Sequence, residues 1–305
     1  MKKTKKDSLI KRRWTEVKKN GMIFNVLGLI PLIWGLALTA LFVWGLVVCF
    51  AEPNWYLDHS NTFLVKEFTL NNFKTAISNF HVVVNDISGG VREAGFWEMT
   101  WNSVWFTAGA TLMKMVATIC FAYACARFEF KGRKLLYAFV ILQMMLPVYG
   151  QTASNYSLMT KLGLVNSPLF LLGLGAGHGM YFLITYSFFR NLPVGYEEAA
   201  KMDGANAFLI FGRVMLPLAK PITTALAIMT AIGTWNDYAT VLVYLPDYPN
   251  LATGLYMIKE KAFTVGLQTP SYFAAIMISI LPVVILFLIF NKQIMNNVSI
   301  GGLKG

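Results

Sequence analysis

The sequence predicts an all-α polytopic membrane protein with six transmembrane helices. Of its 305 residues, 56% are hydrophobic and only 13% are charged, about half the usual share in soluble domains. A further observation is that the uncharged stretches are long, and about 20 apolar residues suffice for a helix to cross a bilayer. This composition excludes a soluble enzyme, a disordered protein and a small disulfide-linked secreted module.

Six windows of the chain are nearly free of charge, and each has room for one membrane-spanning helix. Four contain no charged residue: 20–51, 135–160, 162–189 and 262–291. The other two, 99–126 and 221–246, contain one charge each, Lys114 and Asp237. Helices are the expected form because a helix satisfies its own backbone hydrogen bonds within lipid.

The basic residues predict the orientation in the cytoplasmic membrane. Nineteen of the 26 Lys and Arg residues fall in segments that are cytoplasmic if the N-terminus is inside, in agreement with the positive-inside rule. The chain then divides into a basic cytoplasmic tail (1–25), a first transmembrane helix (26–50), an extracytoplasmic loop (51–97), a core (98–291) and a cytoplasmic tail (292–305). The N-terminal tail is interpreted as an anchor near anionic lipid and not as a nucleic-acid-binding arm, because no nucleic-acid-binding fold accompanies it. The first helix is too long for the apolar region of a signal peptide.

One predicted cytoplasmic segment, residues 191–220, is unlike the other loops. A first short helix is expected from Pro193 to Gly204, which suits a left-handed cap. A second is expected from Asn206, a capping residue, to Leu216, with Pro217 ending it. Three apolar residues fall three and four apart and are expected to share one face: Phe208, Phe211 and Met215. Helices this short need tertiary contacts, so the segment is either an amphipathic loop in the headgroups or a knob that docks into a cytoplasmic partner.

This segment contains a motif that resembles the EAA signature of ABC importer permeases, which is Glu-Ala-Ala, three residues, Gly, nine residues, Ile, one residue and Leu-Pro. The matching residues are Glu198, Ala199, Ala200, Gly204, Val214, Leu216 and Pro217, with Val replacing Ile. The flanking Asp203 and Ala205 resemble the maltose/multisugar branch of that family. Further matches lie at 68–73, 126–133, 144–147, 235–237 and 301–305, so the resemblance covers about residues 65–305.

The resemblance implies a type I ABC importer permease fold and a coupling loop that sits in a separate ATP-binding subunit. The residues implied in this coupling are Glu197, Glu198, Ala199, Ala200, Asp203, Gly204, Ala205, Leu216 and Pro217. Glu198 would pair with a basic residue of the ATPase, and Lys304 and Gly305 of the tail would also reach that subunit. The resemblance further implies a homologous second permease in a heterodimer, two ATP-binding subunits that hold ATP and Mg²⁺, and an extracytoplasmic solute-binding protein. Membrane lipid is expected as a partner and nucleic acid is not.

The chain itself is not expected to be an enzyme or to hold a cofactor. The sequence lacks the phosphate-binding loop Gly-x-x-x-x-Gly-Lys-Ser/Thr, so ATP hydrolysis is expected in another subunit. It also lacks His-Glu-x-x-His and Gly-x-Ser-x-Gly, which weakens the interpretation as an intramembrane hydrolase. Its three cysteines lack metal-ligand or redox spacing and its three histidines are better explained by structural roles, so no metal site is predicted.

Polar residues inside the predicted spans mark a candidate sugar pathway, because such side chains are costly in lipid and tend to face interior cavities. The candidates are Gln143, Gln151, Asn155, Tyr156, Trp235, Asn236 and Asp237. Hydrogen bonding and packing between helices is the alternative role for each. Lys114 and Asp237, the charges deep inside predicted spans, are expected to form an ion pair, unless Lys114 extends to the interface or faces a partner subunit.

The sequence therefore predicts the permease subunit of an ATP-driven sugar importer, with an oligosaccharide as the expected cargo. An importer for another solute, such as glycerol phosphate or a peptide-like compound, remains an alternative. A secondary transporter or channel is less favoured, because the chain has no obvious internal repeat. An intramembrane enzyme is disfavoured by the missing catalytic motifs.

Overall fold

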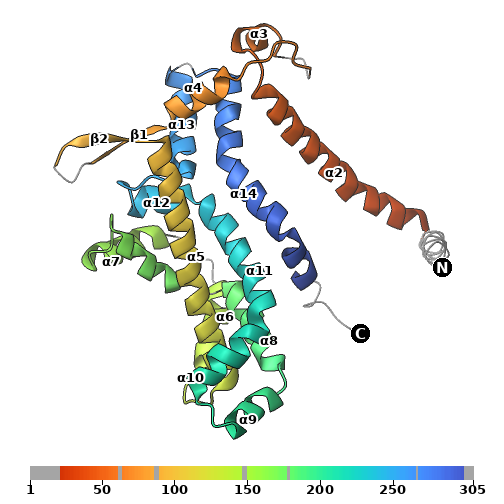
Figure 1. Ribbon diagram of the computed structural model, residues 1–305, viewed down its shortest axis with the longest axis vertical. Helices are drawn as coiled ribbons and strands as arrows, with labels where there is room; N and C mark the ends of the chain where they lie inside the picture. The colour runs from red at the N-terminus through yellow and green to blue at the C-terminus, as the bar shows by residue number, and fades with distance from the viewer. Residues whose placement is uncertain are drawn as a thin grey trace. The chain divides into compact units, whose positions relative to one another are not determined.

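The computed structural model describes residues 21–60, 64–85, 89–145, 150–176, 179–265 and 267–298. These residues form a mostly helical protein with one β-hairpin (Figure 1). The elements up to the middle of the chain are α2 (Gly21–Val48), α3 (Pro53–Asp58), α4 (Asn71–Asn79), β1 (His81–Asn85), β2 (Val91–Gly95), α5 (Phe96–Arg127), α6 (Arg133–Met145) and α7 (Gln151–Lys161). They are followed by the 3₁₀ helix η1 (Pro168–Ala176), α8 (Gly179–Asn191), α9 (Gly195–Met202), α10 (Ala207–Ile210), the π-helical η2 (Phe211–Met215), α11 (Leu216–Trp235), α12 (Tyr238–Tyr244), α13 (Leu251–Val265) and α14 (Thr269–Val298).

The expectation of an all-α fold is wrong at His81–Asn85 and Val91–Gly95, which pair as antiparallel strands with His81 opposite Gly95. β1 has the sequence His-Val-Val-Val-Asn, and β-branched residues favour strands. Val82, Val84 and Ala94 are buried, whereas Val83 is exposed. This alternation is the period of two that a half-buried strand shows.

The chain divides into two compact units, one of residues 1–74 with 268–277 and one of residues 75–267 with 278–305. In the first unit the buried side chain of Asn72 joins three segments. Its amide nitrogen donates hydrogen bonds to the carbonyl oxygens of Cys49 (3.0 Å) and Ala51 (2.7 Å), and its amide oxygen accepts one from the Ser271 hydroxyl (3.3 Å). The end of α2 is thereby held to the start of α14.

The second unit is organised around α5, which makes its most extensive helix contacts with α8 and α11. α5 has 32 residues and no internal proline, so at 1.5 Å per residue it is about 48 Å long. The hairpin lies beside its first turns, and α9 and α10 lie beside its last turns (Figure 1). Near that second end, a buried apolar cluster that includes Cys125, Phe182, Phe189 and Met215 joins α5 to α8 and η2.

Four segments of the described chain are long and apolar enough to cross a membrane: Gly28–Val48, Phe96–Arg127, Ala207–Trp235 and Thr269–Phe290. A fifth is obtained if Pro168–Gly175 and Gly179–Asn191, which are bent by 57°, count as one broken span. The predicted window 135–160 is divided between α6 and α7, and each is too short to cross alone. The predicted window 221–246 is also divided, because α11 ends at Trp235 and α12 begins at Tyr238.

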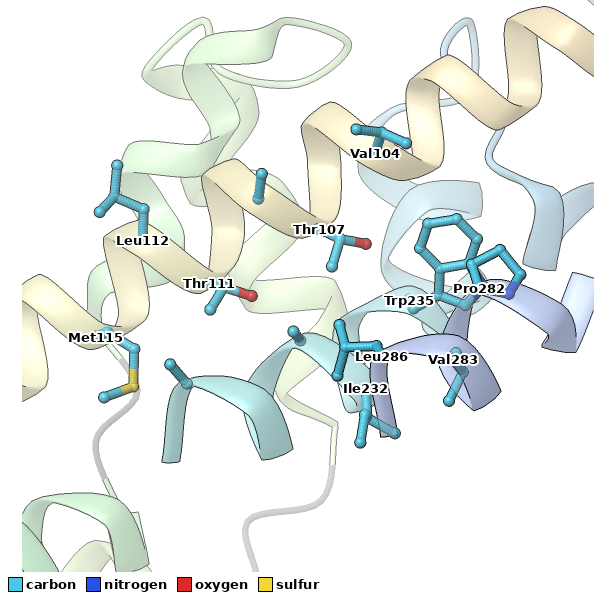
Figure 2. Close-up of a pocket in the computed structure, with 13 residues that line it drawn as sticks. Val104, Thr107, Thr111, Leu112, Met115, Ile232, Trp235, Pro282, Val283 and Leu286 are labelled. Atoms are coloured by element: carbon cyan, nitrogen blue, oxygen red, sulfur yellow. The ribbon is translucent and has the colours of Figure 1, made fainter. Parts of the chain in front are cut away.

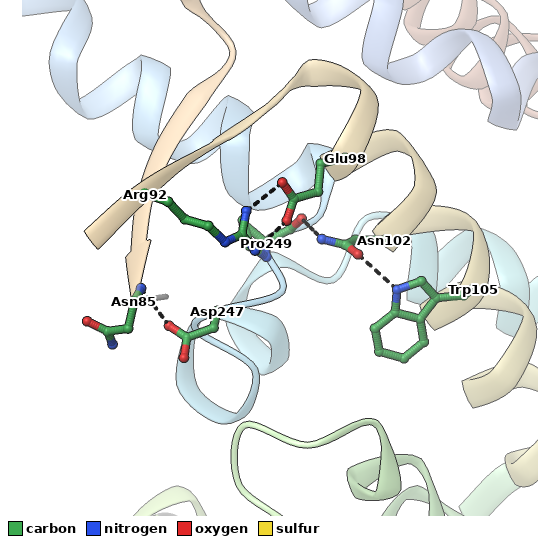
Figure 3. A network of polar contacts seen from close by, with 7 residues as sticks. All are labelled: Asn85, Arg92, Glu98, Asn102, Trp105, Asp247 and Pro249. Carbon is green, nitrogen blue, oxygen red and sulfur yellow. Dashed lines mark hydrogen bonds and ion pairs between the residues drawn. The ribbon is translucent and has the colours of Figure 1, made fainter. Parts of the chain in front are cut away.

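A polar network joins the hairpin, the first turns of α5 and the segment between α12 and α13 (Figure 3). Arg92 and Glu98 form a bidentate ion pair with two contacts of 2.7 Å. The amide nitrogen of Asn102 donates to the carbonyl oxygen of Pro249 (3.0 Å), and one carboxylate oxygen of Asp247 accepts from the backbone N–H of Asn85 (3.0 Å). Backbone polar groups of the connecting segments thus find partners in side chains.

Candidate functional site

The motif segment begins with α9, whose two ends follow from local chemistry. Glu197 and Glu198 lie in its first turn, where carboxylates interact favourably with the helix dipole. Gly204 follows the helix with φ of +81°, a conformation that favours glycine. The N–H of Gly204 donates to the carbonyl oxygen of Lys201 (3.0 Å), and that of Ala205 to the carbonyl oxygen of Ala200 (2.9 Å). The predicted left-handed cap at Gly204 is confirmed.

The second arm begins as predicted but does not end as predicted. The side-chain oxygen of Asn206 accepts from the backbone N–H of Leu209 (2.9 Å), so Asn206 caps α10. The helix then continues through η2 into α11, and Pro217 does not stop it. In η2 the N–H of Leu216 bonds to the carbonyl oxygen of Phe211, five residues back. We attribute the tolerance of Pro217 to this wider turn, because the proline ring would otherwise press on the preceding turn.

The π-helical turn also changes which side chains share a face. Met215 is fully buried in the apolar cluster, and Phe211 packs against that cluster. Phe208, predicted to lie on the same face, is 88% exposed. Met202, at the end of α9, is 89% exposed. These two exposed apolar side chains were not predicted, since the sequence gives no local sign that they point away from the core.

The two glutamates of α9 have different surroundings. The Glu197 side chain is only 12% exposed, and its Oε1 lies 3.2 Å from Nε of Arg127, which is 9% exposed. The two atoms form an ion pair without hydrogen-bond alignment. Nη2 of Arg127 also donates to the carbonyl oxygen of Leu192 (2.6 Å). Glu197 therefore does not belong with the exposed coupling residues, because its carboxylate is used inside the chain to hold α9 to the end of α5.

The remaining motif residues divide into an outer and an inner set. Glu198, Ala199, Asp203, Gly204, Leu216 and Pro217 are exposed. Ala200 and Ala205 are partly buried and pack against the apolar cluster of α5, α8 and η2. α9, α10 and η2 (residues 195–215) form what we call the coupling projection. It is a short helical projection held to α5 by Arg127, with acidic and apolar side chains on its outside.

Among the described residues, the predicted pathway side chains lie on different elements rather than around one cavity. Gln143 is exposed on α6, and Asn155 and Tyr156 are exposed on α7, which begins at Gln151. Tyr156 has its ring 6.0 Å from that of Tyr244 in α12, which brings α7 and α12 together. Asn236 is exposed, and its amide nitrogen donates to the carbonyl oxygen of Ile232 (2.9 Å).

Trp235 lines an apolar cavity of about 500 Å³ between α5, α11 and α14 (Figure 2). Its indole N–H donates to the carbonyl oxygen of Ser279 (3.0 Å), so its polar atom serves helix packing. The hydroxyl groups of Thr107 and Thr111, which also line the cavity, have no hydrogen-bond partner among the described residues. The other wall residues are apolar, and such a wall offers a sugar few hydrogen-bonding groups.

The predicted ion pair between Lys114 and Asp237 is not formed. The Asp237 carboxylate instead accepts from the backbone N–H of Thr240 (2.9 Å) and caps α12. The two charges are also out of register. The Thr230 hydroxyl lies 3.9 Å from the sulfur of Met115, the neighbour of Lys114, whereas Asp237 is seven residues further along the chain, beyond the end of α11 at Trp235. The predicted tail contacts Lys304 and Gly305 lie outside the described residues.

These features define a helical, multi-pass membrane protein with a short helical projection between two of its spans. Residues 116–299 match the family model described as "Binding-protein-dependent transport system inner membrane component". The match covers more than half of the chain, and the chain belongs to this family. It is therefore a non-catalytic membrane permease component of an ABC transport system.

Named relatives and a solved structure agree with this assignment. The arabinooligosaccharides transport system permease protein AraQ of Halalkalibacterium halodurans is 31% identical over 218 residues, 70% of this chain and 76% of that protein. The trehalose/maltose transport system permease protein MalG of Thermococcus litoralis is 29% identical over 266 residues, 87% of this chain and 91% of that protein. The crystal structure of a bacterial ABC transporter involved in alginate import has a chain with a TM-score of 0.69 at 21% identity, covering 88% of this chain and 96% of that one. This last likeness supports the fold.

Proposed function

We propose that the chain is one of two permease subunits of an ATP-driven importer that carries a sugar, with an oligosaccharide as the expected cargo. The observation that carries this proposal is the coupling projection, which is fixed to α5 by the Arg127–Glu197 pair and exposes Met202 and Phe208. Exposed large apolar side chains on a structured projection are typical of a surface that binds another protein. The names of the relatives AraQ and MalG support a sugar as the cargo.

In the proposed mechanism, the coupling projection sits in a cleft of a separate ATP-binding subunit, which holds ATP and Mg²⁺. The exposed carboxylates of Glu198 and Asp203 would meet basic side chains there. Closure of two such subunits around ATP moves the projection. Because Glu197 is tied to Arg127, the movement passes directly to α5. Nucleotide then biases the permease between an inward-facing and an outward-facing state.

We propose six spans, with α6 and α7 together forming one and both termini in the cytoplasm. Four basic residues in 127–134 and four in 190–220 support a cytoplasmic position of these loops. The hairpin end of α5 would then face outward, where the solute-binding protein would contact residues 51–97. Contact of Lys304 and Gly305 with the ATPase stays a prediction.

We propose that the sugar passes between this chain and a homologous second permease. The apolar cavity beside Trp235 is a poor sugar site on its own, because sugar hydroxyls need several hydrogen-bonding partners. The exposed polar side chains of Gln143, Asn155 and Asn236 are better candidates for lining a shared pathway.

ATP-driven uptake into vesicles that contain both permeases, the ATPase and the binding protein tests the proposal. Glu198→Arg should abolish uptake and stimulated ATP hydrolysis, because it reverses an exposed charge on the coupling projection. Glu260→Arg makes the same change on an exposed residue of α13, outside residues 51–97, and should leave ATP hydrolysis normal. Uptake without ATPase or binding protein would contradict the importer mechanism. Uptake of glycerol phosphate or peptides, but of no sugar, would contradict the cargo.

A further inference from the structure

A second concave surface lies where α8 ends and α6 begins, and its lining includes no residue of the coupling projection. This groove has a volume of about 710 Å³. Three cationic side chains line it, Arg133, Lys134 and Arg190, together with one carboxylate, Glu129. The net charge of its lining is therefore positive, and a concave cationic surface concentrates anions.

The cations of this groove are not neutralised within the described part of the chain. The ion pairs there are Arg92–Glu98 and Arg127–Glu197, and neither involves a groove residue. The Arg190 guanidinium donates to the hydroxyl of Tyr186 (2.7 Å), and that of Arg133 to the carbonyl oxygen of Phe128 (3.3 Å). Each guanidinium has further N–H donors, and the planar arginine fork matches phosphate oxygens well.

An apolar helix face adjoins the groove. α6 starts at Arg133, and four of its exposed apolar side chains are spaced so that they share one face of the helix: Leu135, Leu136, Phe139 and Leu142. Tyr137 and Tyr186, with ring centroids 4.8 Å apart, line the groove at the boundary. Tyrosines at such a boundary between charge and apolar surface are typical of the membrane interface. A soluble anion would use the cations only, whereas a phospholipid would use both surfaces.

We propose that this groove binds the phosphate headgroup of an anionic phospholipid from the cytoplasmic leaflet, with an acyl chain along α6. Arg133, Lys134 and Arg190 hold the phosphate, and the exposed leucines and Phe139 contact the chain. Basic pockets between membrane helices on the cytoplasmic side are suited to such lipids. The proposal rests on the proposed cytoplasmic position of the loops, since α8 leads from Arg190 directly into α9.

Binding of phosphatidylglycerol or phosphatidylcholine to the purified permease in detergent, measured by native mass spectrometry, tests the proposal. The variant Arg133→Gln/Lys134→Gln/Arg190→Gln should bind phosphatidylglycerol about fivefold more weakly for each charge removed. The matched control Lys66→Gln/Lys74→Gln/Lys161→Gln removes three exposed charges elsewhere and should bind as the unaltered protein does. If the triple variant does not fold, Lys134→Gln alone, at an exposed side chain, should still show the fivefold loss.

Three results would overturn the proposal: equal binding of both lipids, equal losses in the groove and control variants, or displacement of the lipid by free glycerol phosphate. The last result would assign the groove to a soluble phosphate compound instead. Lipid binding needs neither sugar nor ATPase. A failure of the coupling proposal, seen as normal uptake by Glu198→Arg, would leave these binding results unchanged, so the two failures are distinguishable.

Discussion

Loss of the Glu197 charge should destabilise the permease far more than loss of its neighbour's charge. Glu197→Gln keeps the shape of the side chain but leaves the Arg127 guanidinium, only 9% exposed, without its counter-charge. Breaking a buried ion pair by removing one partner costs about 3–5 kcal/mol, whereas exposed pairs are worth about 0–1 kcal/mol. Arg127 keeps its hydrogen bond to the Leu192 carbonyl, so we expect a loss near the lower limit, about 3 kcal/mol.

The assay is denaturant unfolding of the purified permease in detergent, with Glu198→Gln as the matched control. Glu198 is exposed, and its substitution should change the free energy of unfolding by less than about 0.5 kcal/mol. Arg127→Gln completes a double-mutant cycle, in which the double variant should be more stable than the summed single losses by about 1–3 kcal/mol. Equal effects of Glu197→Gln and Glu198→Gln, or strict additivity in the cycle, would refute the reasoning.

Other substitutions test the rest of the structure. Phe208→Ser should leave the unfolding free energy nearly unchanged but weaken binding of the ATP-binding subunit by about 2 kcal/mol, measured by titration calorimetry, because an exposed aromatic side chain is lost from a docking surface. Gly204→Ala should destabilise the protein by about 1–2 kcal/mol, because a residue with a Cβ is strained at the φ of +81° found there. Gly195→Ala, in the first turn of α9, should be neutral or stabilising. Equal shifts of the melting temperature in the two variants would contradict this prediction. Asp247→Asn should accelerate hydrogen exchange of the Asn85 backbone amide, because a neutral amide oxygen replaces the carboxylate that accepts its hydrogen bond. Unchanged protection of that amide would argue against the contact.

The features of the coupling projection that the sequence predicts are those set by neighbouring residues. Gly204 and Asn206 act as caps through their own backbone and side-chain chemistry, so position and residue type were sufficient. The prediction that Pro217 ends the helix is wrong because the π-helical turn that accommodates this proline depends on how the whole segment packs. The same turn interrupts the 3.6-residue helical period, so Phe208 does not share the buried face of Met215.

Contacts between segments that are distant in the sequence are harder to predict from it. The pairing of Glu197 with Arg127 joins residues 70 positions apart, and neither the motif nor the charge pattern specifies it. Conversely, the position of Lys114 and Asp237 deep in apolar windows predicts an ion pair, but Asp237 lies beyond the end of α11, where it caps α12 instead. Missing charge predicts the membrane windows but not the division of 135–160, and in 221–246 the single charge, Asp237, lies at the division because it caps α12.

The unbroken length of α5 has a mechanical consequence. Its first turn carries Glu98, held by Arg92 of the hairpin, and its last residue, Arg127, holds the coupling projection. A stiff rod about 48 Å long turns a tilt of about 5° at one end into a displacement of about 4 Å at the other. The two ends of this lever cannot be repositioned independently, so in the proposed topology a force that the ATP-binding subunit applies to the coupling projection would be delivered to the hairpin on the other side of the membrane.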